Sequence, residues 1–169
     1  MRWAHHNRGS PPQCHLPVIS SWTLGRIKCA GDGLSEAIEE ATFAPWERRD
    51  IPLGVRTGYS KMDKNAAQLS VRLHLDIGSL RFRREEVRSA SDPMFVALLF
   101  SPGGRYLGGR WKRLALRLSS PMTEQLAASG IDQGFHFDLR PGTYFVRGVA
   151  PESEEGHLAA LNSVGDVPF

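Results

Sequence analysis

Histidines and cysteines gather in the first thirty residues, and they are side chains that zinc commonly takes from a protein. They are His5, His6, Cys14, His15 and Cys29. Structural zinc sites space their ligands in pairs such as Cys-x2-Cys or His-x3-His, and these five residues form no such pair. The sequence therefore predicts no bound metal, and it implies no other cofactor.

Hydrolytic chemistry needs a positioned nucleophile, and the chain has no Gly-x-Ser-x-Gly elbow to supply one. His74 and His136 occupy outward positions of alternating segments, where a histidine is ordinarily solvated. The pairs Gly103-Gly104 and Gly108-Gly109 precede no helix, so they lack the helix N-terminus that cradles a phosphate, and we predict hairpin turns there. The chain is thus not expected to be an enzyme, with a catalytic group assembled from distant residues as the open alternative.

Basic side chains recur in two later segments and could form a stripe along one sheet edge, with Trp111 and Tyr106 as stacking surfaces. The stripe would consist of Arg81, Arg83, Arg84, Arg110, Lys112 and Arg113. Such a stripe could bind nucleic acid or another polyanion, but charged edges also prevent sheets from aggregating. Glu85 and Glu86 interrupt the stripe, and the formal net charge is only +3. The sequence favours edge protection, and nucleic acid is not the expected partner.

The elements that must position these residues are mostly strands. From Ala67 to Ile77 the alternation is unbroken: Ala67, Leu69, Val71, Leu73, Leu75 and Ile77 point one way, and Gln68, Ser70, Arg72, His74 and Asp76 the other. This period of two predicts a half-buried antiparallel strand. Leu80 and Phe82 continue the inward set, whereas 85–93 has the composition of a loop.

Further strands are predicted at 94–100, around 114–118, at 135–139, at 144–149 and at 157–164, with the strand at 94–100 buried on both faces. Pro151 is expected to end the strand before it. Two short helices are predicted, one at 34–43 and one between Ser120 and Gly130. The first is expected to pack at the domain's edge. About eight short strands with regular turn signals predict an all-β, immunoglobulin-like or fibronectin-like antiparallel β-sandwich.

One motif favours a sandwich over a barrel. Leu139 ends a strand, Pro141 and Gly142 form a corner, and Tyr144 opens the next strand. A tyrosine there can bury its ring and return its hydroxyl to the corner backbone, as the tyrosine corner of immunoglobulin-like domains does. The alternative is a plain Pro-Gly turn followed by an ordinary core tyrosine.

The chain of 169 residues is 41% hydrophobic and 23% charged, which suits one domain with its own core. It divides into a disordered extension (1–30), a short helix and linker (31–50) and a β-sandwich domain (51–169). No stretch approaches the roughly 18 apolar residues of a membrane-spanning helix. The first residues also lack the apolar core of a secretory signal.

From Leu34 to Phe169 the order of features resembles the C-terminal region of bacterial von Willebrand factor A-related proteins. The resemblance is carried by FAPWERRDIPLGVRTGY, the alternating strand with its LRF continuation, FSPGGRYLGG, LSSPMTEQLAASGI and FDLRPGTYFVRGV. In that family, whose members are usually exported, this region follows a von Willebrand A domain with a metal site that begins Asp-x-Ser-x-Ser. The motif is absent here, since Asp76-Ile77-Gly78-Ser79-Leu80 has the wrong spacing, so no metal site is carried over.

The resemblance implies a fragment of such a protein that lacks the A domain. Together with the residues, it favours a non-catalytic interaction or structural module that contacts a protein partner. The alternative is a small basic module for nucleic acid or another polyanion. The sequence leaves the partner, the oligomeric state and the location of the chain open.

Overall fold

The computed structural model describes residues 34–63, 66–80, 82–85, 88–151 and 157–168. The predicted extension over 1–30 and Arg81 lie outside these residues. The elements in chain order are α1 (Leu34–Phe43), β1 (Arg48–Arg49), β2 (Leu53–Lys61), β3 (Ala67–Leu75), the 3-10 helix η1 (Ile77–Ser79), β4 (Arg83–Glu85), β5 (Arg88–Ser91), β6 (Met94–Phe100), β7 (Tyr106–Arg113), β8 (Leu116–Leu118), α2 (Ser120–Ser129), β9 (Ile131–Leu139), β10 (Gly142–Pro151) and β11 (Leu158–Val167).

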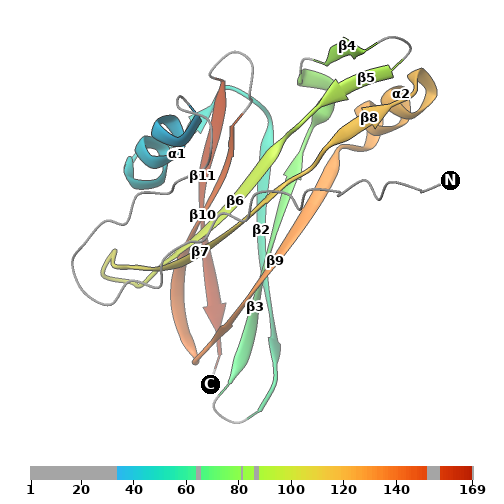
Figure 1. Ribbon diagram of the computed structural model, residues 1–169. Helices are drawn as coiled ribbons and strands as arrows, with labels where there is room; N and C mark the ends of the chain where they lie inside the picture. Colours follow the sequence, from blue (N-terminus) through green and yellow to red (C-terminus); the bar gives the residue numbers. More distant parts are fainter. Residues whose placement is uncertain (1–33, 64–65, 81, 86–87, 152–156, 169) are drawn as a thin grey trace, which may run out of the picture.

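The strands form an all-β antiparallel sandwich with two short helices, as the sequence predicts (Figure 1). One sheet has five strands in the order β1-β11-β10-β6-β7, and the other has three in the order β2-β3-β9. A small third sheet, β4-β5-β8, lies at the end of the sandwich where α2 packs (Figure 1). Because β5 leads into β6 and β7 leads into β8, the β5–β8 pair prolongs the β6–β7 hairpin.

The main core lies between the two larger sheets, and the alternation of β3 accounts for one side of it. Leu69, Val71 and Leu73 are fully buried, whereas Arg72 and His74 are exposed. The predicted inward and outward faces of this strand are therefore confirmed. Opposite them, Phe95, Ala97 and Leu99 of β6 and Val146 and Ala150 of β10 supply the other wall. Burial of apolar surface at about 25 cal/mol per Å² is the term that holds the sheets together.

A second core lies on the outer face of the five-stranded sheet, under α1. Ile38 and Ala41 of the helix pack against a sheet surface made of Met94, Val96, Leu98, Val149, Leu158 and Ala160. This explains why β6 is apolar on both faces, since one face meets β3 and the other meets α1. The helix thus packs on a sheet face, and not at the domain's edge as the sequence suggested (Figure 1).

Two local predictions were wrong. The expected loop contains β5, a short polar strand that owes its conformation to pairing with β4 and β8 and not to any apolar pattern. Gly108-Gly109 lies inside β7, where both residues pair with β6 and make no turn. At Gly109 a Cβ would stand 2.7 Å from Leu98 Cδ2, so the close approach of that side chain favours glycine. β10 ends at Pro151, two residues beyond the predicted end of the strand at Val149.

The sheets meet along the side where β2 faces β11. Thr57 Oγ1 donates a hydrogen bond to Val164 O at 2.8 Å, which joins the edge of one sheet to the other. At the opposite side of the sandwich, β7 and β9 are the edge strands of the two sheets and pair with no further strand among the described residues. There the Arg110 guanidinium of β7 lies 5.6 Å from the ring centroid of Phe137 in β9. Among the described residues, no helix is long and apolar enough to cross a membrane.

Candidate functional site

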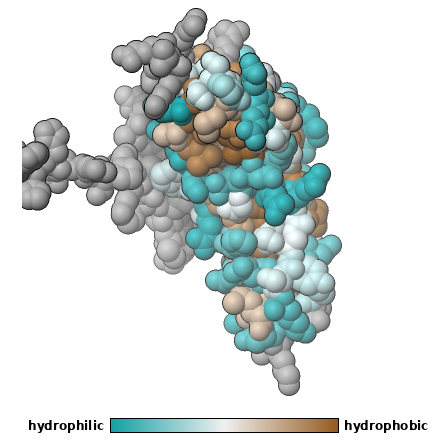
Figure 2. All heavy atoms as spheres, turned by 90° about the vertical axis from the view of Figure 1, so that its right-hand side faces the viewer, coloured by the Kyte–Doolittle hydropathy of each residue, from teal (hydrophilic) through white to brown (hydrophobic). Residues whose placement is uncertain are grey.

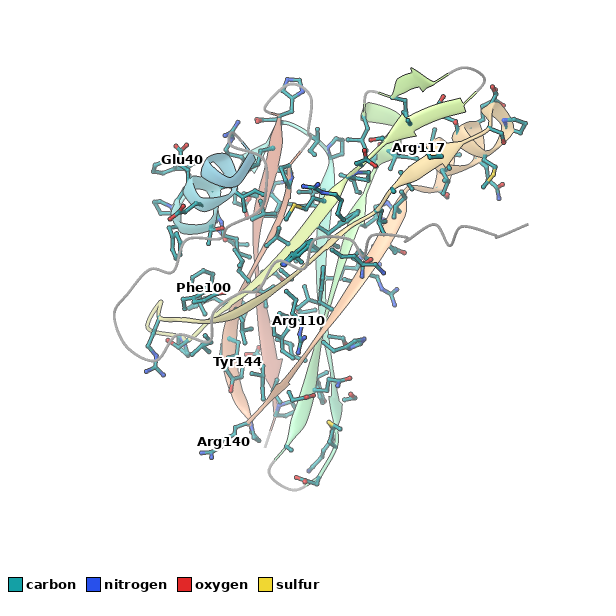
Figure 3. All side chains as sticks on the ribbon, in the orientation of Figure 1. Glu40, Phe100, Arg110, Arg117, Arg140 and Tyr144 are labelled. Atoms are coloured by element: carbon teal, nitrogen blue, oxygen red, sulfur yellow. The ribbon has the colours of Figure 1, made fainter. Side chains whose placement is uncertain are left out.

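The corner between β9 and β10 carries the chain from the three-stranded sheet to the five-stranded one. Tyr144 packs its ring against the main core, and its hydroxyl donates a hydrogen bond to Arg140 O at 2.9 Å. Leu139 also packs on that core, while Pro141 and Gly142 form the bend between the strands. Figure 3 shows Tyr144 and Arg140 near one end of the sandwich. The residues predicted to form a tyrosine corner thus lie together, and they serve the crossing between sheets.

His74 lies on the outer face of the three-stranded sheet, directly opposite Asp132 in the neighbouring strand. Its Nδ1 is 2.9 Å from Asp132 Oδ1, and the two side chains are 47% and 56% exposed. The far side of the imidazole covers Gly130, where a Cβ would stand 2.7 Å from Nε2. Nε2 therefore faces the chain's own backbone, which is a poor position for a general base.

A depression of about 350 Å³ adjoins this histidine and is lined by Arg49, Ile51, Pro52, Leu53, Gly54, His74 and Asp76. It opens widely to solvent. Over the described part of the chain, no three His, Cys, Asp or Glu side chains come close enough to hold a metal ion. The polar side chains that line the depression are Arg49, His74 and Asp76, and His74 is already engaged with Asp132 outside it.

The predicted basic stripe is divided between two sheets. Arg83 and Arg84 are in β4, an edge strand of the small sheet, and Arg110, Lys112 and Arg113 are in β7, the edge of the five-stranded sheet. Since residues alternate along β7, Arg110 and Lys112 face one way and Arg113 the other. The guanidinium of Arg110, which is labelled in Figure 3, is engaged by the Phe137 ring 5.6 Å away. The described members of the stripe thus belong to edge strands of two different sheets, and not to one edge.

The sequence did not single out Arg147, which is only 4% exposed. Its guanidinium donates to three acceptors: Nε to Ala41 O at 2.6 Å, Nη2 to Trp46 O at 2.8 Å and Nη1 to Asn162 Oδ1 at 2.7 Å. Burial lowers the pKa of Arg147, and the nearby carboxylate of Glu47 opposes that shift. This side chain ties α1 and the segment after it to the middle of the five-stranded sheet.

Glu47 completes this polar cluster from the exposed side. Its Oε1 accepts the backbone N–H of Asn162 at 3.0 Å, and its Oε2 accepts Arg49 Nη2 at 2.7 Å. The hydrogen bond from Asn162, followed by the one from Arg49, lowers the pKa of the Glu47 carboxyl. The cluster therefore links α1, β10 and β11 through side chains far apart in sequence.

The last residue of α1 and four neighbouring residues on the outer face of the five-stranded sheet form a line of apolar side chains, which we call the apolar row. Its members are Phe43, Tyr106, Phe100, Phe145 and Val164. The Phe43 and Tyr106 rings meet edge to face at 6.4 Å, and those of Phe100 and Tyr106 do so at 5.7 Å. Phe145 is the Cα partner of both Phe100 and Val164.

Several members of the apolar row are exposed to solvent although they belong to a folded face. Phe43 is 49%, Phe145 43% and Val164 47% exposed. Figure 3 shows Phe100 beyond α1, near the β6–β7 hairpin. Contiguous exposed apolar surface on a soluble domain marks a contact site more often than single exposed side chains do. The apolar row is therefore a candidate contact surface.

One sequence signal could have indicated both features. The segment from Tyr144 to Ala150 is apolar at nearly every position, which predicts a strand covered on both faces. Arg147 stands in that segment on the face opposite Val146, so a buried guanidinium with dedicated acceptors follows from full coverage. Phe145 shares that face, beyond the reach of α1.

The chain was compared with known proteins. No family model matches it, and no curated protein does. Among solved structures, a putative beta-galactosidase from Bacteroides fragilis aligns with 68% of this chain and 16% of its own, at 15% identity and a TM-score of 0.46. A beta-glucuronidase from glycoside hydrolase family 2 aligns with 68% of this chain and 11% of its own, at 10% identity and a TM-score of 0.46.

The C-terminal domain of wzt aligns with 77% of this chain and 85% of its own, at 12% identity and a TM-score of 0.33. The chain therefore spans only a small part of the first two proteins. The three likenesses are distant, and they assign no family to this chain.

Proposed function

We propose that this β-sandwich is a non-catalytic interaction module that contacts a protein partner through the apolar row. The observation that carries the proposal is the exposure of Phe43, Phe145 and Val164 in one contiguous line. Aromatic side chains at the centre of an interface contribute much of its binding energy. Arg147 supports this use, because it holds α1 in place and so keeps Phe43 beside Tyr106.

The absence of a catalytic role is part of the same proposal. The one depression described above presents His74 with its Nδ1 engaged by Asp132 and its Nε2 against Gly130. A cross-strand ion pair of this kind is an ordinary feature of an exposed sheet face. An interaction module needs nothing more from these residues.

We further propose that the chain derives from a von Willebrand factor A-related protein, on the motifs quoted above. In such a protein the partner closest at hand for the apolar row is the A domain that precedes this region. Translating the DNA upstream of Met1 in all frames tests this. An Asp-x-Ser-x-Ser segment encoded there supports the proposal, and upstream DNA without any A-domain sequence contradicts it.

The contact surface can be tested by placing a photo-cross-linking amino acid at position 145 of the full chain in its host cell. We expect an adduct that disappears when Val164→Ser is added to the same chain. The control is the same amino acid at position 60, an exposed site in β2 of the other sheet. Equal adducts from both positions, or none from position 145, would exclude the apolar row as the contact site.

A further inference from the structure

The outer face of the β2-β3-β9 sheet carries two arginines directly opposite each other. Arg56 of β2 and Arg72 of β3 are Cα partners in the antiparallel ladder, and both are exposed. Like charges in this position repel each other and destabilise the pair of strands. Neither guanidinium has a hydrogen-bond or carboxylate partner among the described residues.

The carboxylates that share this face are occupied by other groups. Asp132 accepts from His74 Nδ1 at 2.9 Å, and Asp138 accepts from Gln68 Nε2 at 3.0 Å. Both acids belong to β9, on the side of Arg72 away from Arg56. The region around the two guanidinium groups therefore keeps an uncompensated positive charge.

Three of the residues around the two arginines on this face are glycines, so no side chains rise above the backbone at those positions. Gly54 and Gly58 stand on either side of Arg56 in β2, and Gly134 is the Cα partner of Arg72 in β9. A Cβ at Gly134 would meet nothing within 4 Å, and at Gly54 or Gly58 it would make only ordinary contacts of 3.4 Å or more. Packing does not require glycine there, and a glycine inside a strand often marks a place where a ligand or another backbone approaches closely.

We infer that Arg56 and Arg72 form a binding site for an oxyanion with two or more negative charges, such as a phosphate or sulfate group. Each planar guanidinium can present two parallel N–H donors to such a group. The negative charge of the oxyanion offsets the repulsion between the two arginines. Because three of the neighbouring residues are glycines, a ligand that carries the oxyanion can lie against the backbone of the sheet. Figure 2 shows the side of the molecule on which β9 and α2 lie in Figure 1, and hydrophilic residues cover its middle.

This site is independent of the apolar row, because it lies on the outer face of the other sheet. It also differs from the basic stripe, which involves β4 and β7. Either proposal can fail without the other.

The test is thermal unfolding of the full chain in sodium phosphate and in sodium chloride of equal ionic strength at pH 7. Phosphate also stabilises proteins non-specifically, so the informative quantity is the difference between variants. We expect phosphate to raise the melting temperature of the unmodified chain by a few degrees more than that of Arg56→Gln or Arg72→Gln, since a ligand stabilises only the form that binds it. In chloride at low ionic strength, each variant should melt slightly higher than the unmodified chain.

The matched control is Arg113→Gln, which removes the same charge from an exposed position of β7 in the other sheet. Arg113→Gln should keep the full phosphate increment. The same series with a heparin oligosaccharide tests whether an anion borne on a polymer binds in place of the free ion. Phosphate and heparin increments that are equal in all four proteins would overturn the proposal, and so would an equal loss in Arg113→Gln.

Discussion

Replacing the buried arginine tests how α1 is held on the sandwich. Arg147→Ala removes the donors to Ala41 O, Trp46 O and Asn162 Oδ1 while all three acceptors stay in place. Ala41 O is buried, whereas Trp46 O and Asn162 Oδ1 are only partly buried. A buried acceptor left without a partner costs about 1 to 3 kcal/mol. We expect the free energy of unfolding to fall by about that amount.

The assay is urea unfolding followed by tryptophan fluorescence and circular dichroism, with hydrogen exchange of the α1 amides measured alongside. Arg113→Ala is the control, and as an exposed substitution it should change stability by no more than about 0.5 kcal/mol. Arg147→Met keeps most of the side-chain length without the donors, so it should be nearly as destabilised as Arg147→Ala. A loss below about 1 kcal/mol in Arg147→Ala, with unchanged exchange in α1, would refute this account.

Three further predictions concern the corner, the main core and the cluster around Arg147. Tyr144→Phe keeps the ring and loses the hydrogen bond to Arg140 O, so calorimetry should show a loss of about 1 to 2 kcal/mol, and no change would reduce the corner to a plain turn. Leu73→Ala should cost about 2 to 5 kcal/mol in urea unfolding through the cavity it leaves, whereas His74→Ala should cost at most about 0.5 kcal/mol; the reverse order would contradict the faces assigned to β3. Because the pKa of Glu47 is lowered in the folded chain, its carboxylate contributes fully to the free energy of unfolding above its ordinary pKa. That contribution is lost as the pH falls through the lower, folded-state pKa. Glu47→Gln should therefore flatten the dependence of the urea midpoint on pH below about 4.

The period-two pattern was enough to predict the sandwich and the faces of β3, because the same alternation that buries Leu73 exposes His74. The sequence pattern did not predict structure that depends on which strands pair with each other. Residues 88–91 carry no apolar pattern, and they form a strand only because two partners flank them. The apolar run in β10 indicates that both faces of the strand are covered, but it does not say that α1 is the element that covers the second face.

Arg147 shows the same limit at the level of one side chain. Its acceptors Ala41 O and Trp46 O are 106 and 101 residues away in the chain. The apolar run around Arg147 indicates a covered position, but only the packing of α1 shows which groups accept its hydrogen bonds. The apolar row and the Arg56–Arg72 pair likewise become visible only when the registers of neighbouring strands are known.

The place of the last strand bears on how the protein is made. β11 ends the described chain, yet it lies inside the five-stranded sheet, between β1 and β10. Until β11 has been synthesised, β1 has no strand to pair with and β10 has an unpaired edge of backbone donors and acceptors. Such an edge can pair with a strand of another nascent chain. The interval between the synthesis of β10 and that of β11 is therefore the stage at which the five-stranded sheet is most open to wrong strand pairing.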